Sequence, residues 1–251
     1  MIKSFKIFES NFQIGKICQE LGINNFQIVD GLVNVDGDVD ISDRLTKIPI
    51  KFGRVEGSFY CYNSKLTSLE GAPQSVGGHF NCRHSQLKSL EGAPQSVGGY
   101  FSCHNNQLTS LEGAPQRVGG YFSCYNNKLI TLEGGPEIVG GDFYCHNNQL
   151  TSLEGAPQSV GGDFNCGNNR LTKFTGIPEY SLNEEKSFYC TQNPIFEIYK
   201  LFNTPKCIDL INEYGAIGDG IISRVKLEEV FLELGLEISK NLEFKNYKLV
   251  G

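Results

Sequence analysis

The cysteines are the residues of this chain whose type and spacing first suggest chemistry. Six of the nine stand 21 residues apart, at Cys61, Cys82, Cys103, Cys124, Cys145 and Cys166. Thiolates can ligate zinc, and pairs of thiols can form disulfides. Zinc requires four ligands that converge on one point, however, and an evenly spaced row does not converge. We therefore expect packed, reduced thiols, with no metal site, no disulfide and no cofactor.

Histidines and glutamates are the other side chains that could hold a metal ion. His104 and His146 lie two periods apart, or about 10 Å if each period adds one strand at ~4.8 Å spacing. That distance is too long for both to ligate one ion through bonds of about 2 Å, and His79 belongs to a different column. The glutamates form a column that we interpret as an exposed, solvated edge, with a cation-binding ridge as the alternative: Glu70, Glu91, Glu112, Glu133 and Glu154.

The cysteine spacing is part of a repeat of whole segments. Residues 68–78 recur letter for letter at 89–99 and 152–162, and with small changes at 110–120 and 131–141. The unit reads G-G-x-F-x-C-x-x-N-x-L-T-S-L-E-G-A-P-x-x-V. Its alternating x-F-x-C-x stretch predicts a short strand with Phe and Cys inward. A fixed period of this length predicts stacked units that bury a continuous core, with Gly-Gly allowing close packing of successive units.

This unit resembles the leucine-rich repeat, L-x-x-L-x-L-x-x-N-x-L, in its short form with a non-helical convex side. Phe101 and Cys103 stand at the two strand leucines, Asn106 at the repeat asparagine and Leu108 at the next leucine. The sequence of the repeat unit is most similar to that of short repeat proteins of bacteria and bacteriophages. The resemblance implies an α/β repeat solenoid of parallel short strands with a mostly irregular convex side, and binding through the concave strand face.

The segment before the repeats is predicted to cap the solenoid. Residues 1–38 are expected to form an α/β N-terminal cap, with a helix over 11–21 and a hairpin that pairs 26–29 with 32–35. Asp-Gly between the two short strands is a typical hairpin turn. Residues 39–198 then form the leucine-rich-repeat solenoid, with a degenerate first unit and a last unit reached through a longer insertion.

Residues 199–251 are predicted to form an α-helical C-terminal cap. Short amphipathic helices are expected at 196–202, 206–214 and 223–234. Cys207 and Asp209 make a Cys-x-Asp, which secreted bacterial ubiquitin ligases with similar repeats use in catalysis, but their catalytic domain is several times larger than this segment. The sequence also lacks the phosphate-loop, H-E-x-x-H and G-x-S-x-G motifs, so we do not expect an enzyme.

Three outward columns of the predicted strand vary while the rest of the unit is nearly copied. Tyr and Arg dominate interface hot spots, whereas Ser or Thr would satisfy strand propensity with less exposed aromatic area. We therefore predict a binding face that comprises Tyr60, Tyr62, His79, Arg83, Tyr100, His104, Tyr121, Tyr125, Tyr144 and His146. Protonation of His104 and His146 below about pH 6.5 is expected to make its affinity depend on pH.

Composition favours a recognition protein over several other classes. The net charge of −6 disfavours general nucleic-acid binding, and no apolar run suits a membrane span or a signal peptide. We expect a protein-recognition module in the cytoplasm of a bacterial or phage-infected cell, with a host-interaction or counter-defence role suggested by the resemblance. The alternative is a small-ligand or nucleotide binder that uses Arg83 and the Tyr/His face. The partner's identity and the oligomeric state stay open.

Overall fold

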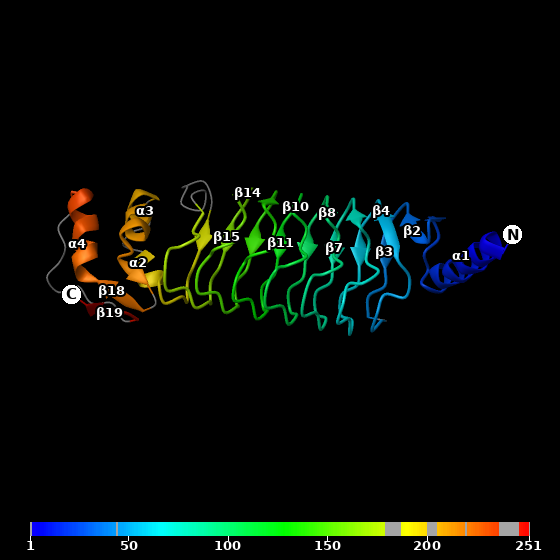
Figure 1. The fold of residues 1–251 in the computed structure, drawn as a ribbon, viewed down its shortest axis with the longest axis horizontal. Coiled ribbons are helices and arrows are strands. Elements are labelled where there is room, and N and C mark those ends of the chain that lie inside the picture. The colour runs from blue at the N-terminus through cyan, green and yellow to red at the C-terminus, as the bar shows by residue number, and fades with distance from the viewer. Residues whose placement is uncertain are drawn as a thin grey trace.

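The chain folds into a parallel β-solenoid of about seven turns. The computed structural model describes residues 2–43, 45–178, 187–199, 205–218, 220–235 and 246–250. Figure 1 shows the turns in one row, with helix α1 (Ile2–Glu20) at one end and helices α3 (Pro205–Tyr214) and α4 (Arg224–Glu233) at the other. The repeat solenoid expected from the 21-residue period is confirmed.

Two sheets of short strands run along the solenoid. The strands that carry the repeat phenylalanine form the first, which we call the Phe sheet. Its members are β3 (Val39–Asp40), β5 (Phe59–Tyr60), β7 (Phe80–Asn81), β9 (Phe101–Ser102), β11 (Phe122–Ser123), β13 (Phe143–Tyr144), β15 (Phe164–Asn165) and β16 (Phe188–Tyr189). Neighbouring strands are parallel, and Phe122 pairs with Phe101 on one side and Phe143 on the other. Equivalent residues of successive turns therefore lie side by side.

The return path of each turn carries a second sheet, which we call the Val sheet. Its members are β1 (Phe26–Val29), β2 (Leu32–Val35), β4 (Phe52–Val55), β6 (Ser75–Val76), β8 (Ser96–Val97), β10 (Arg117–Val118), β12 (Ile138–Val139) and β14 (Ser159–Val160). The sequence predicts the hairpin of β1 and β2 but a mostly irregular path in the repeats. The structure adds β4, β6, β8, β10, β12 and β14. Turns of equal length bring identical backbone groups together, so even two extended residues pair with their copies. Two residues are too few to show a periodicity.

The interior of each turn is filled by one phenylalanine, one cysteine, two leucines and one valine. In one turn these are Phe101, Cys103, Leu108, Leu111 and Val118, all fully or almost fully buried. The phenylalanine rings stack along the axis, with centroids 5.2 Å apart at the centre of the row. All nine cysteines are free and buried. The inward orientation predicted for Phe and Cys is confirmed.

The repeat asparagine holds the corner after the Phe strand. The side-chain amide of Asn148 donates to the carbonyls of Cys124, Cys145 and His146 at 3.0–3.3 Å. Its side-chain oxygen accepts from the backbone N–H of Leu129 at 3.0 Å. The same pattern recurs at Asn106, Asn127, Asn169 and Asn193. These buried amides satisfy backbone groups that no strand partner reaches, which confirms their structural role.

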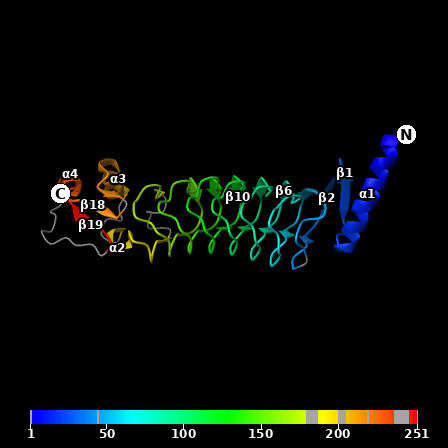
Figure 2. The ribbon, with the colours of Figure 1, turned by 60° about the horizontal axis from the view of Figure 1, so that its bottom comes forward.

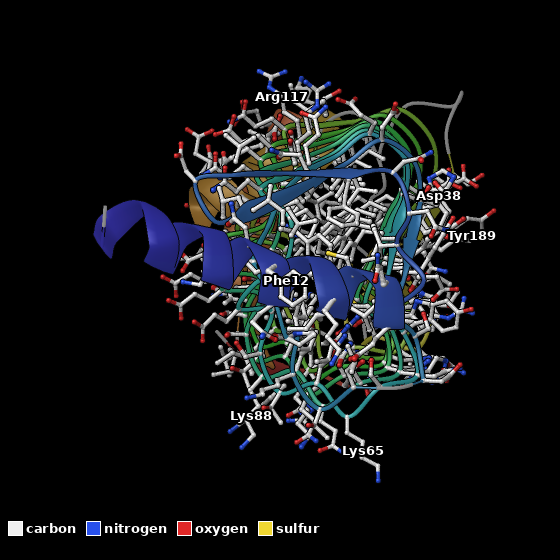
Figure 3. All side chains as sticks on the ribbon, turned by 90° about the vertical axis from the view of Figure 1, so that its right-hand side faces the viewer. Phe12, Asp38, Lys65, Lys88, Arg117 and Tyr189 are labelled. Carbon is white, nitrogen blue, oxygen red and sulfur yellow. The ribbon has the colours of Figure 1, made fainter. Side chains whose placement is uncertain are left out.

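The N-terminal segment closes one end of the solenoid. Helix α1 begins at Ile2, well before the helix expected over 11–21. The predicted hairpin is confirmed: β1 and β2 are antiparallel, with Val29 opposite Leu32. Strand β2 then pairs in parallel with β4, so the hairpin extends the Val sheet. Figures 2 and 3 show α1 beside this hairpin and across the open end of the row, where Cys18 is fully buried.

The C-terminal segment contains the expected short helices and one small sheet. Helix α2 (Phe196–Tyr199) follows the last turn, and α3 and α4 pack on each other. Strands β17 (Ile217–Gly218), β18 (Ile221–Ser223) and β19 (Lys248–Val250) form a three-stranded sheet that the sequence analysis does not predict. None of the described helices is both long enough and apolar enough to cross a bilayer.

Candidate functional site

The ten residues predicted as a binding face lie on the outer side of the Phe sheet. Tyr60 and Tyr144 belong to strands β5 and β13. Three of the others stand directly before a strand of this sheet, and five stand two residues after a strand, just past the repeat cysteine. Because the sheet is parallel and in register, its turns place them in three columns. We call this surface the aromatic face: Tyr60, Tyr62, His79, Arg83, Tyr100, His104, Tyr121, Tyr125, Tyr144 and His146.

One ring stack occupies the column before the repeat phenylalanine. The rings of His79 and Tyr100 have centroids 4.0 Å apart and planes 16° apart. Tyr100 and Tyr121 follow with centroids 4.6 Å apart and planes 4° apart. Tyr144 meets Tyr121 edge-on at 6.2 Å and closes the stack. The strand spacing of the solenoid is thus reproduced by rings on its surface.

A second stack occupies the column after the repeat cysteine. The ring of Tyr125 lies between His104 at 4.2 Å and His146 at 4.5 Å, with all three planes nearly parallel. An intervening phenol ring therefore separates the two imidazoles. Among the described residues, no group of three or more His, Cys, Asp or Glu side chains is arranged to hold a metal ion.

Small residues lie between the two stacks. Asn81, Ser102 and Ser123 are 3%, 1% and 2% exposed, although they point away from the core. The hydroxyls of Ser102 and Ser123 lie 2.8 Å and 3.3 Å from Nδ1 of His104. The rings of both columns cover this floor, so the aromatic face is broad and filled. A hollow of about 1080 Å³ beside Asn34 and Arg54 lies at the Val sheet instead.

In the column before the repeat phenylalanine, most side chains make a hydrogen bond that supports the fold, but Tyr100 and Tyr121 do not. At most turns the side chain there accepts from the backbone N–H of the same position one turn later, at 2.7–3.0 Å: Asp38, Ser58, His79, Asp142 and Asp163. Tyr100 and Tyr121 offer no such acceptor. Among the described residues, no side chain accepts from the backbone N–H of Tyr121 or Asp142 as happens at the other turns. A bond that supports the fold is replaced at these turns by exposed aromatic surface.

Arg83 is the cation of the aromatic face. Its guanidinium carbon lies 4.9 Å from the centroid of the Tyr62 ring, a cation–π contact. Its Nε is buried and has no hydrogen-bond partner among the described residues. Burial raises the pKa of Tyr100 and Tyr121, and the charge of Arg83 opposes that rise at both phenols.

The expectation that His104 and His146 become protonated below about pH 6.5 is wrong. Burial, together with the nearby His84, Arg83 and His146, lowers the pKa of His104 to about 4. Burial also lowers the pKa of His146. Each imidazole packs against the ring of Tyr125, which replaces the water that would stabilise the charged form. His104 therefore stays neutral over most of the range in which an exposed histidine titrates, and His146 becomes protonated at a lower pH than an exposed histidine.

A ladder of asparagines, exposed or half-buried, lies beside the second stack and was not predicted from the sequence. Asn105, Asn126, Asn147 and Asn168 have φ of 51–56°, and each side-chain amide contacts the side chain one turn earlier at 2.7–3.1 Å. The ladder ends on Nε2 of His84. Asparagine is enriched at left-handed positions, so the recurrent first Asn of Asn-Asn was the available signal.

The remaining chemical candidates stay apart from this surface. The five column glutamates are exposed, as expected for a solvated edge. Cys207 is buried, which raises the pKa of its thiol, while Asp209 is exposed. A raised thiol pKa disfavours the nucleophilic thiolate.

Known proteins give no direct indication of function for this chain, so the functional proposal depends on the geometry of the site. No protein-family model, curated protein or solved structure matches this chain. The stacked 21-residue turns establish a repeat solenoid. Assignment to the leucine-rich repeats rests on the residue pattern alone.

Proposed function

We propose that this protein is a recognition module, not an enzyme, and that it binds a protein partner through the aromatic face. The observation that carries this proposal is the pair of tyrosines at 100 and 121. They stand where neighbouring turns use a side-chain acceptor, and Tyr121 is 37% exposed. The exchange gives up a hydrogen bond between turns for stacked rings that stay partly exposed, and binding surfaces use tyrosine for its large and rigid contact area.

The stacking favours a protein partner over a planar small ligand. Ring centroids are 4.0–4.6 Å apart within the stacks, so the inner ring faces are already occupied. The surface offers ring edges, phenol hydroxyls and imidazole nitrogens over several turns. A broad, prepacked surface loses little side-chain entropy on binding, which suits contact with another folded surface. The small-ligand or nucleotide alternative is less well supported, because the face is filled rather than hollow.

The finer biological role rests on the resemblance of the repeat unit. Similarity to short leucine-rich repeats of bacteria and bacteriophages supports a host-interaction or counter-defence role in the cytoplasm of an infected cell. The partner in that case is a host protein.

The test is a quantitative comparison of two triple variants. Tyr100→Ala, Tyr121→Ala and Tyr125→Ala together remove ring area from both stacks. A partner captured by the unmodified protein is purified, and its affinity for each variant is measured by calorimetry. We expect at least a 100-fold loss, because truncated hot spots cost about 2 kcal/mol or more each.

The matched control changes three repeat positions beside the Val sheet. Gln95→Ala, Gln116→Ala and Gln158→Ala alter exposed residues on another side of the same turns. We expect the control to bind normally, and both variants to retain the circular dichroism spectrum of the parent. Unchanged binding by the tyrosine variant would refute the assignment of function to the aromatic face.

A further inference from the structure

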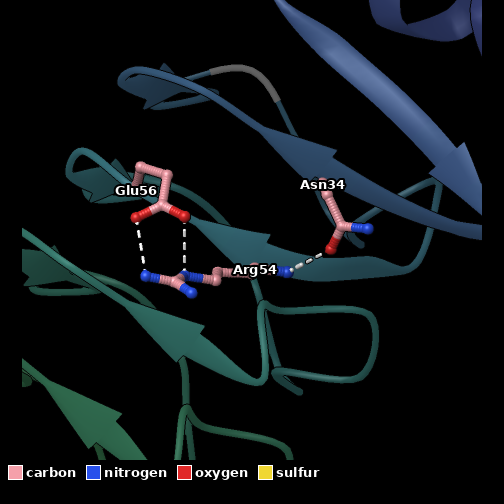
Figure 4. A network of polar contacts seen from close by, with 3 residues as sticks. All are labelled: Asn34, Arg54 and Glu56. Carbon is pink, nitrogen blue, oxygen red and sulfur yellow. Dashed lines mark hydrogen bonds and ion pairs between the residues drawn. The ribbon is translucent and has the colours of Figure 1, made fainter.

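Arg83 differs from the other arginines of the described chain in its surroundings. Arg54 makes a two-pronged contact with Glu56, at 2.7 Å and 2.8 Å (Figure 4). Arg224 pairs with Glu228 at 2.9 Å, and the two remaining described arginines are exposed to water. Arg83 is half-buried, has no carboxylate within ion-pair distance among the described residues, and has a buried Nε without a partner.

The groups around Arg83 are neutral rings. Tyr62 covers one side of the guanidinium at 4.9 Å. The charge of Arg83 also influences Tyr100, Tyr121 and His104, which places these side chains in its vicinity. Phenol hydroxyls and a guanidinium are all hydrogen-bond donors, and a positive charge amid donors is complementary to an anion.

The carboxylates of the neighbouring column are already engaged. Asp142 accepts from the backbone N–H of Asp163 at 2.8 Å and from the hydroxyl of Tyr144 at 2.7 Å. Asp163 accepts from the backbone N–H of Ser187 at 3.0 Å. These bonds fix both aspartates on the turns that carry them, so the protein itself does not neutralise Arg83 with them.

We propose that Arg83 is an anchor for an oxyanion carried by the partner, either a carboxylate or a phosphoryl group. This inference rests on the proposed function for the partner itself, but the anion site is a property of the free protein. A guanidinium presents a fork of donors that matches both groups in two-pronged geometry. A half-buried guanidinium without an ion-pair partner gains charge-assisted hydrogen bonds when such a group meets its accessible donors.

The first experiment titrates the free, full-length protein with small anions. The Nε–Hε signals of the arginines are followed by ¹⁵N NMR as acetate, methyl phosphate or chloride is added at constant ionic strength. We expect the Arg83 signal to shift saturably with an oxyanion, with half-saturation on the order of 10 mM. The Arg54 signal serves as the internal control, because Glu56 already occupies its fork. Tighter binding of acetate identifies a carboxylate, and tighter binding of methyl phosphate a phosphoryl group.

Substitution separates the fork geometry from charge alone. Because neither variant has an Arg83 Nε–Hε signal, their titrations are followed at the backbone amide signal of Tyr62, whose ring contacts the Arg83 guanidinium. Arg83→Gln should abolish the saturable shift, and Arg83→Lys should weaken the affinity about tenfold because a lysine is a point charge. Arg117→Gln, an exposed arginine of the Val sheet, should leave the titration unchanged. A response of Arg83 to chloride equal to that for both oxyanions, or no saturation by either, would overturn the inference.

The outcome is independent of the test of the proposed function. If the tyrosine variant loses its partner but Arg83 binds no oxyanion, the binding face stands and the anion site falls. If Arg83 binds oxyanions but the tyrosine variant binds its partner normally, the anion site stands and the proposed function falls.

Discussion

Replacing Gly119 by alanine is the sharpest perturbation that the solenoid offers. Gly119 opens the Gly-Gly step that leads into Tyr121 on the aromatic face. A Cβ added there would lie 2.0 Å from the carbonyl oxygen of Gly98 and 2.9 Å from its carbonyl carbon. Both atoms are backbone, so no side chain can swing away. Ordinary contact begins near 3.4 Å, and the two turns must therefore separate by more than 1 Å.

The magnitude follows from the bonds that hold those turns together. The N–H of Gly119 donates to the carbonyl of Val97 at 3.0 Å, and the N–H of Gly120 donates to that of Gly99 at 2.8 Å. Separation by more than 1 Å breaks both. Neither glycine is buried, so each lost hydrogen bond costs about 0.5–1.5 kcal/mol, and forced overpacking costs about 1–3 kcal/mol. We expect the free energy of unfolding to fall by roughly 2–6 kcal/mol.

The assay is urea unfolding followed by far-ultraviolet circular dichroism, with both midpoint and slope recorded. Gly218→Ala is the matched control, because its added Cβ meets nothing within 4 Å. The control should change stability by less than about 0.5 kcal/mol. If Gly119→Ala were as stable as the control, the inference that glycine is required by close contact between turns would be refuted.

Three further predictions concern the core, the corner and acid pH. Cys124→Ser should destabilise the fold by about 1–3 kcal/mol, since it buries a hydroxyl; rapid reaction of Cys124 with a thiol reagent in the folded protein would contradict its inward position, because burial raises the pKa of that thiol. Asn148→Ala should lower the free energy of unfolding in urea by about 3 kcal/mol, because it leaves buried backbone groups without partners. Asn147→Gly, on the asparagine ladder, should cost less than about 1 kcal/mol; equal losses would contradict the structural role of the corner. His104 has a lower pKa in the folded protein than in the unfolded chain, so protonation disfavours the fold as pH falls from about 6.5 toward 4. The free energy of unfolding should fall by about 2 kcal/mol over this range, after allowance for solvent screening. His104→Gln should reduce this loss, and an identical pH profile of the variant would refute the prediction.

The 21-residue period was sufficient to predict the architecture. Identical spacing of Phe, Cys, Leu and Asn fixes which side chains are inward, and the structure confirms these columns. The composition of the aromatic face was also readable, because its positions vary between otherwise copied units. The repeat pattern did not predict how side chains of neighbouring columns pack on one another. Ser102 alternates outward by sequence yet is 1% exposed, because the rings beside it cover it.

Contacts between turns also determine the pKa of His104 and the strands that the sequence pattern did not predict. A pKa depends on the rings packed around His104, and these come from other turns of the solenoid. The Val-sheet strands that follow β2, and the strands β17, β18 and β19, have two to four residues each, too few for a periodic signal. Pairing with neighbours, rather than local propensity, determines such strands.

Because the turns stack in register, equivalent residues of the aromatic face are separated by whole multiples of the strand spacing. Deleting one complete unit, residues 99–119, joins Gly98 to Gly120 and leaves the pattern of every remaining turn intact. Arg83 would then stand one strand spacing, about 4.8 Å, nearer to Asp142. When repeats are gained or lost, the distance between two contact residues on different turns changes only by whole strand spacings. A partner that contacts two such residues therefore requires a particular number of turns between them. Gain or loss of a repeat can thus alter specificity abruptly while leaving the chemistry of every contact unchanged.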